Sequence, residues 1–231
     1  MDKKLILILL IVVALMGCTT TKELTYGDED IALGKEAVIK MAQMLIDSAV
    51  ESFSAQFILT PINAMPTKFE PLLMAQNEVP GLRGLLEGYL EAMRSDVVEI
   101  VKEIPDNFGT EVMRQMDIGE PYTLIKGNND AVTRYLASFY ANETEEWLTH
   151  EIQKKEKGIA AWNKLIRTYN NFLLGKGRLT KEEVTLLDGS PTLEITVALI
   201  RHLIEEMSRQ EALIRSLAPT YEDPLILLFS R

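Results

Sequence analysis

Apolar residues recur along most of the chain at steps of three and four, which is the spacing of one face of an α-helix. The clearest stripe covers residues 82–104, and shorter ones cover 38–49, 132–152, 159–173 and 193–217. No stretch sustains the period-two alternation that is typical of β-strands. The pattern therefore predicts an all-α fold, a single helical-bundle-like domain of several amphipathic helices.

Helix-breaking and capping residues fall between these stripes, where helices are expected to begin or end. Pro80 and Gly81 precede the longest stripe, while Ser190 and Asp223 each stand directly before a proline, the order favoured at a helix start. Asp106, which follows Pro105, is also expected to cap a helix. The apolar residues 225–229 near the chain end are expected to form a short helix that docks on the bundle.

The N-terminus shows a different pattern. Two lysines precede an apolar run at 5–15, and the only cysteine follows at Cys18. A membrane span needs about 20 apolar residues, whereas a run of this length is typical of a secretory signal peptide. The segment Leu15-Met16-Gly17-Cys18 resembles the bacterial lipobox, in which signal peptidase cuts before a lipid-modified cysteine. We therefore expect residues 1–17 to be a lipoprotein signal peptide and Cys18 to be lipidated; the alternative is an ordinary secreted protein.

Charge and composition restrict how such a protein would be held. Residues 18–30 form a polar tether, about 20 Å long as a flexible coil, ahead of one all-helical domain at 31–231. The formal net charge of −10 argues against nucleic-acid binding and against adhesion to anionic headgroups. We expect the lipid on Cys18 to hold the protein to the membrane, in the cell envelope facing the periplasm. Thr19, a residue other than Asp after the cysteine, favours the outer membrane where the organism has one.

The most distinctive internal stretch is TLIKGNNDAVTRYLASFY, residues 123–140. Its Gly-Asn-Asn turn is expected to separate two helices, with Asp130 at the favourable end of the second. Asn129, Asp130, Thr133 and Tyr135 are candidates for a ligand or partner surface at this helix start. The alternative is that Asp130 caps the helix and Tyr135 packs with its hydroxyl hydrogen-bonded.

Three stretches resemble a bacterial group, domain-of-unknown-function family 4197. Its Gly-Gly-Asp-x-Ala-Ala-Thr-x-Tyr signature is matched at Gly127, Ala131, Thr133, Tyr135 and Leu136, with departures at Asn128 and Val132. Two further segments match at Tyr169 and Asn170, and at Glu211, Ile214 and Arg215. The resemblance covers about residues 33–229. It implies an exported helical protein from a family without an established activity, so it assigns no site residue.

Candidate catalytic and metal-binding residues are few. Glu146 with His150, and His202 with Glu205, place a carboxylate and an imidazole one helical turn apart. Neither pair has the Glu-x-x-His order of di-iron bundles, and solvated ion pairs explain both. The Gly-Lys in GKGRLTK, residues 175–181, lacks the rest of a phosphate-binding loop and is expected to be a basic surface turn. We predict no catalytic residue and no cofactor.

These observations favour a non-enzymatic binding or scaffolding module, which engages an envelope protein through a helix groove or an exposed apolar patch. The first alternative is a helical bundle that binds a small molecule or lipid, with aromatic residues such as Tyr135, Phe139 and Trp147 lining a cavity. The second alternative is a metal-dependent enzyme that uses His150 and His202.

Overall fold

The computed structural model describes residues 26–109, 113–180 and 183–230. These residues form helices and connecting segments without a strand, so the predicted all-α fold is confirmed. No helix among them combines the length and the apolar composition needed to cross a membrane. The predicted signal peptide, Cys18 and most of the tether lie outside the described residues.

Five long helices make up most of the structure. They are α2 (Asp28–Gln56), α5 (Leu82–Val101), α9 (Ala131–Lys154), α10 (Glu156–Thr180) and α11 (Thr192–Leu217). The short α-helices are α3 (Pro61–Ala64), α4 (Glu70–Met74), α6 (Ile104–Phe108), α8 (Pro121–Ile125) and α12 (Pro224–Leu227), and the 3-10 helices are η1 (Thr67–Phe69), η2 (Ala75–Asn77) and η3 (Ala218–Thr220).

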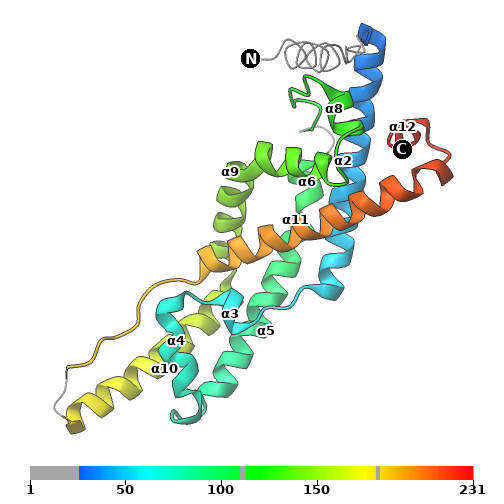
Figure 1. Ribbon diagram of the computed structural model, residues 1–231. Helices are drawn as coiled ribbons and strands as arrows, with labels where there is room; N and C mark the ends of the chain where they lie inside the picture. Colours follow the sequence, from blue (N-terminus) through cyan, green and yellow to red (C-terminus); the bar gives the residue numbers. More distant parts are fainter. Residues whose placement is uncertain (1–25, 110–112, 181–182, 231) are drawn as a thin grey trace, which may run out of the picture.

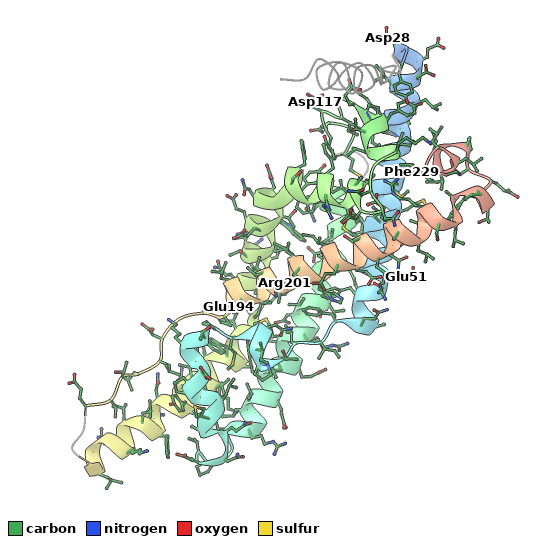
Figure 2. The ribbon with its side chains drawn as sticks, viewed as in Figure 1. Asp28, Glu51, Asp117, Glu194, Arg201 and Phe229 are labelled. Carbon is green, nitrogen blue, oxygen red and sulfur yellow. The ribbon has the colours of Figure 1, made fainter. Side chains whose placement is uncertain are left out.

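The helices form an elongated arrangement with α11 crossing its middle (Figure 1). At one end, α5 packs along α10. At the other end, α8 and α12 pack on α2. Helix α11 packs on both α9 and α2. Figure 2 marks its course by Glu194 near its start and Arg201 further along.

The apolar stripes form the core, as the sequence predicts. On α2, Val38, Met41, Leu45 and Ala49 are all buried, one helical turn apart. Among the described residues, the buried core extends from Ala37 to Phe229. Because we expect residues 1–17 to be removed as a signal peptide, we expect a chain of residues 19–231 to fold.

The N-terminus of α10 is capped by another helix. Asp96 on α5 is buried, and its carboxylate accepts a hydrogen bond of 2.7 Å from the backbone N–H of Gly158. A methyl group at position 158 would lie 3.0 Å from the Cα of Met93. The glycine therefore lets α10 approach α5 closely enough for a short carboxylate side chain to reach its first turn.

Some of the predicted helix starts are confirmed and others are wrong. Helix α5 begins after Gly81, whose φ of +77° suits glycine, and Asp223 caps α12 by accepting from the N–H of Leu225. Ser190 accepts from the N–H of Thr192, but α11 begins at Thr192, so the cap position is occupied by Pro191 rather than by Ser190. The predicted cap at Asp106 is wrong: the residue lies inside α6, since Pro105 occupies its first turn, where a missing N–H costs no intrahelical bond.

The predicted surface turn at 175–181 is also wrong for residues 175–180, which the structure describes. Helix α10 continues to Thr180, through Gly175 and Gly177. Each glycine costs only about 1 kcal/mol relative to alanine in a helix, which does not stop one that is otherwise well formed. Lys181 lies outside the described residues.

The chain end docks on the bundle, as predicted. Ile226 and Phe229 are fully buried, and α12 packs on α2. The guanidinium of Arg215 lies 4.9 Å from the centroid of the Phe229 ring, close enough for a cation–π contact. Figure 2 shows Phe229 at this end of the molecule.

Candidate functional site

An apolar groove of about 190 Å³ lies between α9 and α11. Both helices contribute residues at steps of three and four, so each presents one face to it. We call it the α9–α11 groove. Its lining comprises Thr133, Leu136, Ala137, Tyr140, Thr144 and Glu145 of α9, Ile200, Leu203, Ile204 and Met207 of α11, Ile46 of α2, and Ile104 and Phe108 of α6.

Hydrogen bonds fasten the two helices together on either side of the groove. On one side, Glu211 of α11 accepts from the backbone N–H groups of Val132 and Thr133 at 3.0 and 2.8 Å. On the other side, the hydroxyls of Thr149 and Thr196 lie 3.2 Å apart. The two fastenings are about 24 Å apart along α9, at 1.5 Å per residue. The groove lies between them, where the facing side chains leave space.

Glu211 forms a buried ion pair with Arg215, and this pair is hydrogen-bonded to the end of α8 and to the start of α9. Arg215 donates to the Glu211 carboxylate, at 2.9 Å from Nε, and to the backbone carbonyls of Leu124 and Ile125 at 2.8 and 2.6 Å. The Thr133 hydroxyl also donates to Glu211, at 2.8 Å. The pair therefore satisfies carbonyls at the end of α8 and N–H groups at the start of α9, groups that helix termini leave without intrahelical partners.

The expectation that Asp130 caps α9 with its side chain is wrong. Its carboxylate accepts instead from Nε of Arg134 at 2.8 Å, and Glu211 does the capping. The reason is that the two first-turn N–H groups are already bound by a buried carboxylate whose charge Arg215 balances. The expected packing of Tyr135 is confirmed, because its hydroxyl donates to the carbonyl of Asp117 at 2.9 Å.

The four candidates for a ligand or partner surface point to different surroundings. Thr133 is buried and lines the α9–α11 groove. Asn129 is exposed and lines a separate hollow beside Arg215. Asp130 pairs with Arg134, while the ring of Tyr135 stacks on Phe139. Binding at these positions stays a prediction.

The aromatic residues proposed from the sequence to line a cavity do not line this groove. Tyr135, Phe139 and Trp147 are absent from its lining, and Phe139 is 44% exposed. Tyr140 and Phe108 line it instead, with their rings 5.7 Å apart. Helical spacing identifies the apolar stripe of α9, but it does not tell which edge of the stripe borders an open space.

Among the described residues that line the groove, one carries a charge. Glu145 stands at the edge of the groove, is exposed, and forms no ion pair with the described residues. The hydroxyl of Tyr140 is buried without a hydrogen-bond partner among those residues. Burial, with Tyr135 and Glu143 nearby, raises the pKa of Tyr140, so the phenol stays neutral. The interior of the groove is therefore uncharged at neutral pH.

The metal-site candidates do not come together. His150 is exposed, and its Nδ1 lies 3.5 Å from Glu151 rather than beside Glu146. His202 packs against the rings of Phe53 and Phe57, at 5.4 and 5.2 Å. Across the part of the chain that the structure describes, no three His, Cys, Asp or Glu side chains cluster in a way that could hold a metal ion.

Three large apolar side chains in or next to α3 and α4 are exposed. Ile58, Ile62 and Met74 are 69%, 90% and 77% exposed. Large exposed apolar groups of this kind occur at protein interaction sites. These exposed side chains are accessible to an envelope protein. That such a protein binds here stays a prediction.

Comparisons of the chain with family models, curated proteins and solved structures find no match. The resemblance to family 4197 therefore stays a prediction that depends on the quoted motifs. In the structure, two of those motifs meet: Thr133 of the first binds Glu211 of the last. Thr133, Glu211 and Arg215 of these motifs therefore belong to one buried hydrogen-bonded cluster.

Proposed function

We propose that this protein is a lipid-anchored binding protein of the cell envelope, and that the α9–α11 groove holds the hydrocarbon part of a small amphiphile. The observation that carries the proposal is the groove itself, whose lining is almost wholly apolar. Ligand sites are concave and mostly apolar, with a few polar groups that orient the ligand.

The size of the groove fits this role. A cavity of about 150 Å³ lined by apolar side chains holds benzene, and the α9–α11 groove measures about 190 Å³. Because it is partly open to solvent, a longer chain can lie in it with one end outside. Burial of hydrocarbon supplies about 0.8 kcal/mol per methylene, so each methylene that the groove buries tightens binding about fourfold.

The N-terminal pattern supports the location. A lipid on Cys18 and a tether at 18–30 would keep the domain close to the membrane, at about 20 Å when the tether is a flexible coil and about 40 Å when it is fully extended. A membrane is also the source of molecules with hydrocarbon chains. We favour binding without catalysis, because the carboxylate that accepts from the Thr133 hydroxyl, Glu211, is already bound by two backbone N–H groups and by Arg215.

The test is to fill the groove and measure binding of a neutral fluorescent probe, N-phenyl-1-naphthylamine, to residues 19–231. Ala137→Phe places a ring in the groove, and Ala160→Phe adds the same ring at an exposed position of α10. We expect saturable binding by the parent chain and by Ala160→Phe, with at least about tenfold weaker binding by Ala137→Phe, because the added ring occupies the volume that the probe needs.

Circular dichroism of all three chains provides the control for folding. The proposal is wrong if the parent chain shows no saturable binding, or if Ala137→Phe is folded and binds as tightly as the parent.

A further inference from the structure

We infer that the α9–α11 groove selects a single-chain amphiphile with a cationic, primary-ammonium head, and that Glu145 is the residue that sets this preference. The inference rests on the proposed function, because it names the class of ligand for the same groove. It follows from the position of Glu145, the one charged group among the described lining residues, and from the groups around it.

The lining places its polar and apolar groups in an order that suits an amphiphile. Thr144 and Glu145 lie at one end of its α9 face and Thr133 at the other, about 18 Å apart at 1.5 Å per residue. The residues between them are Leu136, Ala137 and Tyr140, opposite the apolar face of α11. A hydrocarbon chain that follows α9 therefore brings its head to Glu145.

The charges around the head position favour a cation. Among the described residues, no Lys, Arg or His lines the groove, so an anionic head would find no cationic partner in that lining. Glu145 has no ion-pair partner among the described residues, and the neighbouring Glu143 and Glu146 are also exposed. A carboxylate head would thus meet like charges, whereas an ammonium head would meet an available carboxylate.

The hydrogen-bonding groups point to the same chemistry. An ammonium group has three N–H donors and no acceptor. Glu145 and Thr144 stand next to each other at the head position and offer a carboxylate and a hydroxyl, both of which accept hydrogen bonds. An exposed ion pair of this kind changes affinity by about two- to fivefold, enough to rank ligands that share one hydrocarbon chain.

The experiment compares three probes with the same chain length: dodecylamine, dodecan-1-ol and dodecanoate. Each is titrated, below its micelle concentration, against N-phenyl-1-naphthylamine bound to residues 19–231 at pH 7 and low salt. We expect the amine to compete best, the alcohol next and the carboxylate least, with about a fivefold or larger difference between amine and carboxylate. Salt at 0.5 M should narrow this difference, because the head position is exposed.

Two matched variants assign the preference to one residue. Glu145→Gln should bring the three affinities to within about twofold of one another, while Glu146→Gln, which removes a neighbouring charge outside the groove lining, should keep the order. Equal affinities in the parent chain, or an unchanged order in Glu145→Gln, would overturn the inference and leave the proposed function standing. If neither the fluorescent probe nor any of the three chains binds saturably, both are wrong.

Discussion

Replacement of Glu211 by Gln tests the fastening that closes one end of the α9–α11 groove. In the native chain the Glu211 carboxylate binds two backbone N–H groups of α9, the Thr133 hydroxyl and the Arg215 guanidinium. All of these partners are hydrogen-bond donors. A glutamine amide at this position would turn an N–H₂ group toward donors and would leave the buried Arg215 charge unbalanced.

The expected cost follows from burial. The side chains of Arg215 and Glu211 are 2% and 0% exposed, so solvent cannot compensate the lost partner. Removal of one member of a buried ion pair costs about 3–5 kcal/mol. A domain of this size gains or loses about 2–4 °C in melting temperature per kcal/mol, which predicts a decrease of about 6–20 °C.

Urea unfolding followed by circular dichroism at 222 nm measures the effect. Asp130→Asn is the matched control, because Asp130 stands at the start of the same helix and pairs with Arg134 at the surface. Its loss should cost less than about 1 kcal/mol. The double replacement Glu211→Gln with Arg215→Met should recover part of the loss, because it removes the unpaired charge.

The reasoning would be refuted if Asp130→Asn proved as costly as Glu211→Gln, or if Glu211→Gln unfolded within about 1 kcal/mol of the parent chain. Either result would mean that the Glu211 carboxylate is not the main group that stabilises the start of α9.

Two further predictions concern pH and helix contact. Burial alone would raise the pKa of the Glu206 carboxyl, but hydrogen bonds from Gln210, Arg209 and Ser52 outweigh it and lower the pKa. The ionised Glu206 therefore stabilises the folded protein fully above the unfolded pKa of about 4.3, and this contribution is lost as the pH falls through the folded pKa. The urea midpoints of Glu206→Gln and of the parent chain should converge between pH 7 and pH 3. A gap between the midpoints that stays constant over this range would contradict the prediction. Gly158→Ala should destabilise the folded protein by about 1–3 kcal/mol, because the new methyl group meets Met93. Gly88→Ala, which has open space around it, should instead stabilise it by about 0.5–1 kcal/mol. Equal urea midpoints for the two variants would show that α10 and α5 are not in close contact at Gly158.

Much of the fold could be predicted from the sequence, because amphipathic spacing reports directly on which side of a helix is buried. The stripe of Val38, Met41, Leu45 and Ala49 is the buried face of α2, and Gly81 ends the segment before α5. Local signals of this kind depend on residues within a few positions of each other, so the order of residues along the chain contains them.

The candidate site could not be predicted in the same way, because it depends on contacts between distant residues. Glu211 caps a helix that begins about eighty positions earlier, and no local pattern distinguishes it from other helical glutamates. Likewise, Leu136, Ile200 and Ile204 have the spacing of core residues. The structure shows that these residues border a groove, which lies between the hydrogen bonds of Glu211 to α9 and the contact of Thr149 with Thr196.

The central claim is that the α9–α11 groove holds the chain of an amphiphile, and methyl NMR tests it most directly. Isoleucine methyl groups of residues 19–231 are followed during a titration with dodecylamine. We predict shifts at Ile46, Ile104, Ile200 and Ile204, which line the groove, and none at the exposed Ile62. Shifts that are confined to Ile62 and its surroundings, or absent from the four groove residues at saturation, would contradict the account.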